Sequence, residues 1–443
     1  MSALPYLDAA ALERLVPVGR AVRVLEDALR GGLDPEATPQ RPVVDVPAGQ
    51  LLLMPAAAGR YVGVKAVTIA PGNPERGLPR IQGTYLLLDG DTLAPLAAMD
   101  GIALTSLRTP AVSALAVRHL AEPGGGKLVV FGSGPQAWGH VVAFREVRPI
   151  TEVTIVGRDR ERAESLAARC RTLGLPSRAL THHPPAAPGG APHVCGGASD
   201  ASGGAPPTSG GVPAASGHAP SAATGDAAAP HEHAAAPPGG EAAVYGREGA
   251  VSGGAAALPI GVADRTGGEA AVSGGEAGSP RREPARPAHG HRAGETGGRV
   301  DRRLRADVAG WRLSEAVAAA VAEADLVACC TTARKPLFPG MLARDGVTVV
   351  AVGSHEPGAR ELDGDLVARA TVVVEARAAA LAEAGDVVIP IRQGTITTGH
   401  LAGNLAELIA GEVLAGPGPR VFKSTGMAWE DLVVAAAAYE AWK

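Results

Sequence analysis

The stretch that decides the fold is KLVVFGSGPQAWGH, residues 127–140, followed after a short connection by VTIVGRDRERAESLAARC, residues 153–170. Its first five residues form an apolar, β-branched run, which predicts a strand. Gly132, Ser133 and Gly134 predict a turn, and the residues from Gln136 onward predict a helix. This order is typical of the βαβ units that bind dinucleotides, in which N–H groups at the helix N-terminus attract a pyrophosphate.

The glycine turn has the pattern G-x-G-x-x-A. Gly132 and Gly134 allow the backbone to approach a phosphate, and the small Ala137 allows the helix to pack tightly on the strand. A pattern of this kind also occurs in loops that bind nothing. The second predicted strand, residues 153–157, favours cofactor binding, because it arrives where such a fold presents the residue that contacts the adenosine ribose.

The residues after this second strand bear on which dinucleotide binds. An NAD site usually has Asp or Glu there, whereas an NADP site offers Arg to the 2′-phosphate. Arg158 lies where the carboxylate would be, so NADP is favoured. Asp159 follows directly and keeps NAD possible. Alternatively, these charges only solvate the start of a helix.

The composition excludes several classes of function. The chain has 443 residues, enough for two domains with cores, and a formal net charge of −4. This balance predicts no nucleic-acid partner and no membrane surface. No signal peptide is recognised, and no apolar run reaches the roughly 20 residues of a membrane helix. The four cysteines lack zinc-ligand spacing, so we expect a reduced, cytoplasmic protein.

The residues before the dinucleotide unit predict a separate α+β region. Apolar residues recur at helical spacing over residues 4–31, with a break at Pro17. Short strand patterns separated by turns follow over residues 41–100 and predict an antiparallel sheet. Residues 103–121 predict a helix with Arg108 near its start, where the helix dipole and a guanidinium would both favour a carboxylate.

A change of composition interrupts the dinucleotide unit. Ala, Gly, Pro, Ser and His dominate from about Thr181 to Val300, which predicts disorder because little apolar surface can be buried. Its histidines could bind a metal, but no rigid element fixes two of them, so no metal site is predicted. Beyond it, a helix over 304–324, apolar strands and a helix around 401–410 predict the rest of a parallel sheet covered on both faces.

Five segments occur in an order that identifies a family. They are GVKAVTIAPGNPERGLPRIQGTYLLLDGDTLAPLAAMDG, ALTSLRTPAVSALA, VVFGSGPQA, VGSHEPGARELD and VFKSTGMAWEDL. With them the chain resembles the ornithine cyclodeaminase/mu-crystallin family. The resemblance implies a homodimer with an α/β fold: a Rossmann domain plus an α+β substrate and dimerisation domain. The implied boundaries are 1–120 with 426–443 for the substrate domain and 121–180 with 301–425 for the Rossmann domain; the insertion that the composition predicts to be disordered occupies 181–300.

The resemblance also implies the residues of a site. By motif, the family's ligands for the substrate carboxylate map onto Arg41, Lys65 and Arg108. Three cations suit a small acid, because a carboxylate accepts about four hydrogen bonds and Arg can engage it bidentately. Lys65 lies among apolar residues, where desolvation could lower its pKa and make it a proton donor or acceptor. The expected cofactor-binding residues are Thr109, Gly132, Gly134, Pro135, Gln136, Ala137, Arg158, Thr331, Thr332 and Gly353.

Two positions depart from the cyclodeaminase pattern. Leu52 stands where that enzyme is expected to carry an acid for the distal amine of ornithine. His355 stands where it is expected to carry a catalytic aspartate. Because an apolar residue cannot pair with an ammonium group, ornithine is a poor candidate substrate. Lys65 and His355 are the expected catalytic residues.

The favoured function is therefore hydride chemistry on a small amino-acid-derived carboxylate. We expect an NAD(P)H-dependent reductase of a ketimine or of pyrroline-2-carboxylate, or an amino-acid dehydrogenase, which is the same chemistry in reverse. A cyclodeaminase-type ammonia lyase that uses NAD internally is one alternative. A crystallin-like protein that binds NADP without turnover is the other.

Overall fold

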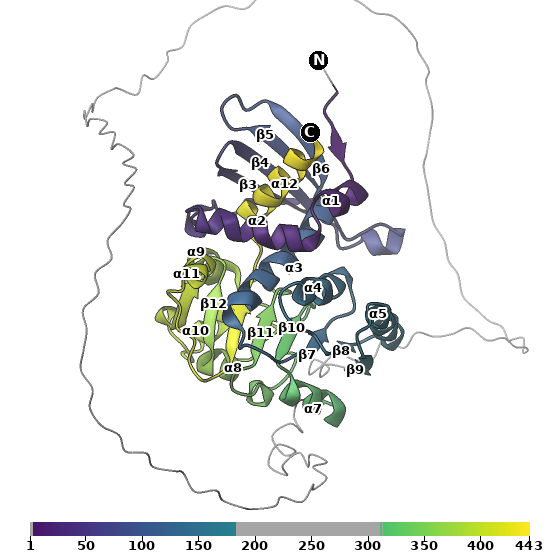
Figure 1. The fold of residues 1–443 in the computed structure, drawn as a ribbon, viewed down its shortest axis with the longest axis vertical. Helices are drawn as coiled ribbons and strands as arrows, with labels where there is room; N and C mark the ends of the chain where they lie inside the picture. Colours follow the sequence, from purple (N-terminus) through teal and green to yellow (C-terminus); the bar gives the residue numbers. More distant parts are fainter. Residues whose placement is uncertain (1–2, 183–310, 312) are drawn as a thin grey trace, which may run out of the picture. The chain divides into compact units, whose positions relative to one another are not determined.

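The computed structural model describes residues 3–182, 311 and 313–443 of the chain. These residues form two β-sheets, one of six strands and one of eight (Figure 1). The low-complexity insertion predicted at 181–300 lies outside the described residues, except for its first two positions. Within the described ranges, no helix is long and apolar enough to cross a membrane.

The six-stranded sheet has the order β1-β6-β5-β4-β3-β2 and is antiparallel except for the parallel pair of β1 and β6. The antiparallel sheet predicted before the dinucleotide unit is thus confirmed. Its strands are β1 (Tyr6–Leu7), β2 (Val43–Val46), β3 (Gly49–Ala58), β4 (Tyr61–Ile69), β5 (Ile81–Asp89) and β6 (Pro95–Asp100).

Two helices from distant parts of the chain, α3 (Gly101–Leu120) and α12 (Ala428–Trp442), pack on this sheet. The amphipathic α2 (Val18–Arg30) packs against both of them, and the short α1 (Ala9–Leu15) precedes it. On β4 the pleat turns alternate residues toward this helical layer, and Lys65 is one of the buried residues of that series. The prediction that Arg108 lies near the helix start is wrong. The Asp100 side chain caps α3, which places Arg108 two turns into the helix.

The eight-stranded sheet is entirely parallel, with the order β13-β12-β14-β11-β10-β7-β8-β9. Its strands are β7 (Lys127–Phe131), β8 (Glu152–Gly157), β9 (Ser177–Thr181), β10 (Leu326–Cys329), β11 (Thr348–Ala351), β12 (Thr371–Val374), β13 (Leu401–Asn404) and β14 (Arg420–Lys423). Along β7, Leu128 and Val130 enter one core while Val129 and Phe131 enter another, so the sheet is buried on both faces.

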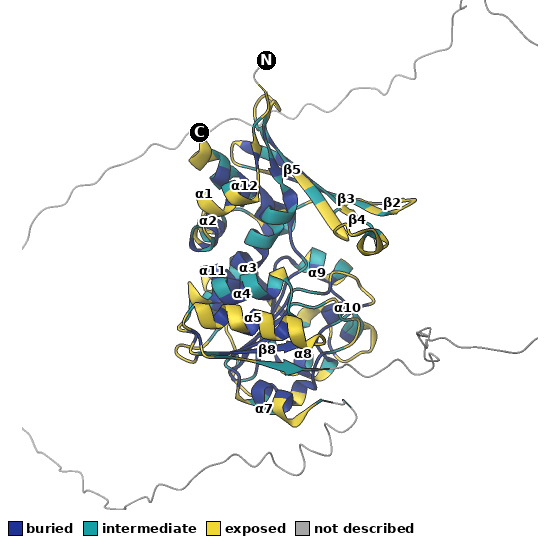
Figure 2. Ribbon diagram, turned by 90° about the vertical axis from the view of Figure 1, so that its right-hand side faces the viewer, coloured by how far each residue is buried: buried dark blue, intermediate teal, exposed yellow. Residues whose placement is uncertain are grey.

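Helices cover the two faces of this sheet (Figure 2). The core that also contains α3 takes apolar residues from α4 (Pro135–Arg145), α5 (Arg160–Thr172) and α11 (Leu405–Ala410). The opposite core takes them from α7 (Glu315–Glu323), α8 (Gly364–Arg369), α9 (Arg377–Glu383) and α10 (Gly385–Arg392). A doubly wound Rossmann sheet beside an α+β region is the fold class that the sequence predicted.

Two predicted helices can be compared with the structure near their starts. The first residues of the helix predicted over 304–324 lie outside the described residues, and α7 begins at Glu315, where the Ser314 side chain accepts a hydrogen bond from the Val317 N–H. The helix predicted around 401–410 is wrong for its first four residues, which form β13. Asn404 then starts α11 by a reciprocal capping box with Glu407.

Candidate functional site

A cavity of about 590 Å3 lies at the glycine turn between β7 and α4. Gly132 has a φ of +119°, and a Cβ on it would lie 2.6 Å from the Cys330 carbonyl oxygen, so only glycine fits. Gly134 caps α4 without a side-chain hydrogen bond and has open space before it. N–H groups at the start of this eleven-residue helix therefore face a space that suits a pyrophosphate.

The predicted cofactor residues divide into two groups. Gly132, Gly134, Arg158, Thr331 and Thr332 line the cavity. Pro135, Gln136 and Ala137 lie in the first turn of α4, Thr109 is buried in α3, and Gly353 follows β11; these five are not among the lining residues.

Sequence reasoning missed several cationic side chains of the cavity. Arg162, Arg334 and Lys335 line it together with Arg158. Arg334 pairs with Glu356, but neither Arg158 nor Arg162 forms an ion pair with a described residue. The repeated arginines in GRDRER gave a signal, but only the structure around the start of α5 shows that Arg158, before the helix, and Arg162, in its first turn, line the cavity while Arg160 does not.

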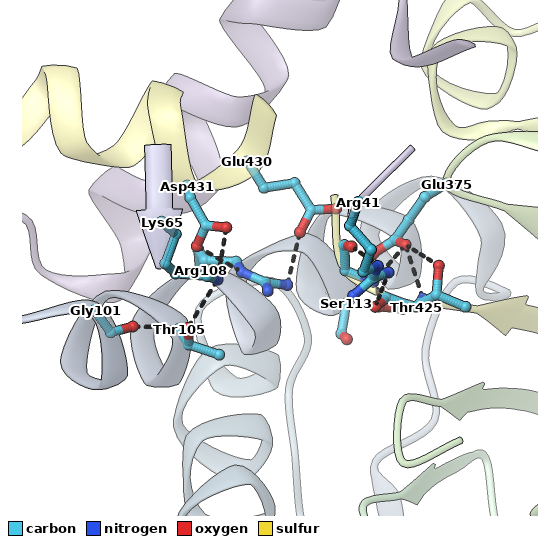
Figure 3. A network of polar contacts seen from close by, with 12 residues as sticks. Arg41, Lys65, Gly101, Thr105, Arg108, Ser113, Glu375, Thr425, Glu430 and Asp431 are labelled. Carbon is cyan, nitrogen blue, oxygen red and sulfur yellow. Dashed lines mark hydrogen bonds and ion pairs between the residues drawn. The ribbon is translucent and has the colours of Figure 1, made fainter. Parts of the chain in front are cut away.

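A second group of polar residues is buried between α3, α12 and β4 (Figure 3). Lys65 is 1% exposed, and its Nζ donates to Oδ2 of Asp431 at 2.7 Å and to Oγ1 of Thr105 at 3.0 Å. Arg108 is 5% exposed and donates through Nε to Oδ1 of Asp431 at 3.1 Å and through Nη1 to Oε2 of Glu430 at 2.8 Å. Two of the three predicted carboxylate ligands thus meet on one aspartate.

The third predicted ligand, Arg41, contacts neither Asp431 nor Glu430 in the described residues and forms its hydrogen bonds elsewhere. It pairs with Glu383 of α9, and its Nη2 also donates to the carbonyl oxygens of Thr425 at 3.0 Å and Gly426 at 3.1 Å. Gly426 connects it with Arg108, whose guanidinium lies against the same residue. Arg41 therefore lies at the margin of the cluster formed by Lys65 and Arg108.

His355 follows β11 and is exposed. Desolvation and then the positive charge of Arg41 lower the pKa of His355 from its ordinary value. Among the described residues it forms no hydrogen bond. The structure gives His355 proximity to Arg41 but no defined partner.

Burial and ion pairing change the protonation of the two buried cations. The pKa of Lys65 is lowered to about 8. Burial is the main cause, Asp431 opposes it, and the positive charge of Arg108 adds to it. Burial also disfavours the charged Arg108, but Asp431 and Glu430 outweigh it and raise the pKa of Arg108 above its ordinary value. Arg108 is therefore a fixed cation, while Lys65 can gain and lose a proton near neutral pH.

The cavity and the buried cluster lie along the same edge of the parallel sheet. β7 and β10 end at the cavity, whereas β14 leads to Gly426 and α12. In the strand order, β14 and β10 are separated by β11 alone, so their ends are about 10 Å apart, two interstrand spacings. Ligands of open α/β sheets bind at this carboxyl edge. A dinucleotide in the cavity can therefore extend toward Arg108 and Lys65.

Gly426 provides a test of the cluster. A Cβ at this residue would lie 2.7 and 2.8 Å from the two terminal nitrogens of Arg108. Gly426→Ala should raise the KM for the substrate by at least about tenfold, since displacing Arg108 weakens a charge-assisted contact. Gly411→Ala is the matched control, because Gly411 has almost the same φ, +80° against +79°, and no atom near the added methyl group. Equal steady-state constants for the two variants would contradict this account.

Comparisons with known proteins were consistent with one another. Residues 12–190 and 299–443 match the model of the ornithine cyclodeaminase/mu-crystallin family. A Delta(1)-pyrroline-2-carboxylate reductase of Bacillus cereus is 25% identical over 396 residues, covering 88% of this chain and 80% of the relative. The ketimine reductase mu-crystallin of Rattus norvegicus is 27% identical over 414 residues, covering 91% and 85%. The structure of Thermococcus litoralis Delta(1)-pyrroline-2-carboxylate reductase with NADH and L-proline has the same fold, with a TM-score of 0.65, 22% identity and coverage of 99% and 97%.

Proposed function

The chain belongs to the ornithine cyclodeaminase/mu-crystallin family, and from that premise we propose that it is an NADPH-dependent reductase of a small cyclic imino acid such as Δ1-pyrroline-2-carboxylate. The observation that carries the proposal is the meeting of Lys65 and Arg108 on Asp431, at the sheet edge that also holds the cofactor cavity. The relatives in Bacillus cereus and Rattus norvegicus are named as reductases of C=N bonds, and we assign the same class of reaction to this chain.

The buried cations retain donors for a substrate carboxylate. Lysine carries three N–H groups and arginine five. Lys65 uses two of its own on Thr105 and Asp431, and no described residue accepts a hydrogen bond from Nη2 of Arg108. A carboxylate can therefore bind to Arg108 without breaking its ion pairs. Arg41 acts at the margin of this site, through its charge.

Reduction of the imine needs a hydride for the C=N carbon and a proton for the nitrogen. The glycine turn and the start of α4 would hold the pyrophosphate of a reduced nicotinamide cofactor, which when bound would supply the hydride. Lys65 donates the proton, because a pKa of about 8 keeps it mostly protonated at neutral pH yet acidic enough to release the proton. The product is the cyclic amino acid, and Lys65 regains its proton from solvent.

The sheet face beside Lys65 carries apolar side chains. A diamine substrate would need an acidic side chain there to bind its distal ammonium group. In the register of β3 and β4, Met54 lies opposite Lys65 and Leu52 lies opposite Val67. Residues two apart share one face of a strand, so Leu52 lies on the face of Lys65, one diagonal step away. The site therefore favours an uncharged ring over the distal ammonium group of ornithine.

The function is tested by comparing the imino acid with ornithine. With Δ1-pyrroline-2-carboxylate, the near-ultraviolet absorbance of NADPH should fall as one proline forms for each NADPH oxidised. With ornithine and the oxidised cofactor, no ammonia should be released. Ammonia release from ornithine without net change in cofactor would instead establish the lyase, and binding of NADPH without either reaction would establish a non-catalytic protein.

The preference for NADPH is supported by the charges of the cavity. Arg158 and Arg162 line it without an ion-pair partner among the described residues. Asp159, the residue that would suit NAD, uses one carboxylate oxygen to cap α5 by accepting from the Arg162 N–H at 3.1 Å. Two free guanidinium groups beside a committed carboxylate suit a 2′-phosphate better than a ribose diol.

Exchanging Arg158 for aspartate should reverse or narrow this preference. One charge-assisted hydrogen bond to a phosphate contributes about 1.5–3 kcal/mol, which is about 10–100-fold in the Kd for NADPH. Arg160→Asp is the control, because it makes the same change of charge two residues away on a residue that does not line the cavity. It should leave the ratio of the Kd values for NADPH and NADH near the parental ratio. Titrations of both cofactors by fluorescence measure the ratio. Equal affinities for NADPH and NADH in the parent would show that Arg158 does not bind the phosphate.

The proposal includes a homodimer, the assembly implied by the family resemblance. The edge strand β2 supports it, because Val43, Val44 and Val46 are exposed there on a strand with one unpaired side. A mass in solution equal to that of a single 44.4 kDa chain would contradict it.

A further inference from the structure

A buried carboxyl group beside Arg108 has one oxygen that no donor satisfies. Glu430 is fully buried in the first turn of α12, and its Oε2 accepts from Nη1 of Arg108. Its Oε1 is buried as well, and no described residue donates a hydrogen bond to it. A buried anionic oxygen without a donor is costly. A protonated oxygen that itself donates would remove this cost.

Glu375 is the acceptor for such a proton. It follows β12 directly, and its carboxyl group acts on Glu430 both through its charge and through a side-chain hydrogen bond, each of which raises the pKa of Glu430. Its own oxygens accept from Oγ of Ser424 at 2.6 Å and from the N–H groups of Thr425 and Gly426, both at 2.8 Å. Because the oxygens of Glu375 already accept these three hydrogen bonds, the hydrogen between the two carboxyl groups is assigned to Oε1 of Glu430, which has no donor of its own. Burial, and then Glu375, raise the pKa of Glu430 well above its ordinary value, although Arg108 opposes this.

We propose that Glu430 is a neutral carboxylic acid that donates its proton to Glu375, and that this neutrality makes it a positioning residue for Arg108 in substrate binding. The inference rests on the proposed function for its role in binding. The protonation state itself stands on the buried Oε1 of Glu430, to which no described residue donates, and on the donors that surround Glu375.

The charges around Glu430 explain why a neutral side chain favours substrate binding. Lys65 and Arg108 are the two cations that face it, and Asp431 and Glu375 are two further carboxyl groups; Arg41 is balanced by Glu383. An ionised Glu430 would leave three carboxylates against two cations, and the excess negative charge would repel an imino acid. A neutral Glu430 removes the excess while its Oε2 still holds Nη1 of Arg108 in place.

Glutamine is the appropriate replacement because it reproduces the neutral acid. In Glu430→Gln the amide oxygen accepts from Arg108 and the amide nitrogen donates to Glu375, so KM should stay near the parental value. Glu430→Ala removes both contacts and should raise KM by about 10–100-fold. In the parent, KM should rise as the pH approaches the pKa of Glu430, and Glu430→Gln should lose that rise.

Infrared spectroscopy decides the protonation state without any turnover. The difference spectrum between the parent and Glu430→Gln, recorded at neutral pH with NADPH bound, should contain the C=O stretch of a protonated carboxylic acid. The difference spectrum between the parent and Glu407→Gln is the control and should lack this C=O band. The Arg377 side chain keeps the pKa of Glu407 below its ordinary value, so Glu407 is ionised at neutral pH. A missing band, or a tenfold higher KM in Glu430→Gln, overturns the proposal. A parent without reductase activity that retains the band overturns only the proposed function.

Discussion

Replacing Lys65 by methionine should lower kcat by roughly 10²–10⁴, the usual contribution of a positioned proton donor. Methionine matches the apolar stem of the buried lysine side chain but lacks its ammonium group, and Arg108 remains to compensate Asp431. The affinity for NADPH should change little, because Lys65 does not line the cofactor cavity. Steady-state kinetics and a cofactor titration on the same preparation measure the two effects. Lys127→Met is the matched control, since Lys127 is exposed and pairs with the surface residue Glu323.

The pH dependence identifies the donor. If Lys65 donates, kcat/KM for imine reduction should fall as the pH rises through about 8, because the protonated form is then lost. If His355 donates, the fall should occur below the ordinary histidine value of about 6.5, since the pKa of His355 is lowered. His355→Ala should keep most of the parental kcat. Parental kcat in Lys65→Met would exclude Lys65 and leave water as the proton source.

Arg108→Lys should raise the KM for the imino acid by about 10–100-fold with a smaller change in kcat. Lysine preserves the charge, but its ammonium group lacks the planar fork with which the Arg108 guanidinium contacts Asp431 and Glu430 and would contact a substrate carboxylate. The carboxylate does not change during the reaction, so loss of its contact weakens binding more than it slows chemistry. Arg377→Lys makes the same replacement at the bidentate pair with Glu407, outside the cluster, and should leave KM unchanged.

Arg108→Ala should also destabilise the fold. Removing one partner of a buried ion pair costs about 3–5 kcal/mol, and here Glu430 and Asp431 would both lose a donor. Urea denaturation measures the loss. A parental KM in Arg108→Lys together with parental stability in Arg108→Ala would contradict both the substrate contact and the buried network.

The sequence was sufficient for the architecture because the relevant signals are local. An apolar run, a glycine turn and a helix start specify the unit from Lys127 to Arg145, and each of these features depends on neighbouring residues. The start of α11 was predicted less well. A capping box between Asn404 and Glu407 determines where this helix begins, and the apolar residues before it follow no clear period.

The candidate site was predictable only in part. The resemblance placed Lys65 and Arg108 together, but it did not reveal that a shared carboxylate holds them. The partners are Glu430 and Asp431, two adjacent acids at the start of a largely apolar helix. That pattern was available as a signal for buried cations, since charged residues on an apolar face need partners. Which cation each acid meets depends on the packing of α12 against α3 and β4, which no local pattern contains.

Transfer of deuterium from the cofactor to the substrate carbon tests the central claim most directly. The protein is incubated with Δ1-pyrroline-2-carboxylate and each of the two diastereomers of NADPH deuterated at C4 of the nicotinamide, and the proline is analysed by mass spectrometry and NMR. The account predicts that one diastereomer gives proline with deuterium on the carbon that bears the carboxylate, in equal amount to the NADP+ formed. Proline without deuterium from either diastereomer, or no proline from protein that binds NADPH, would contradict it.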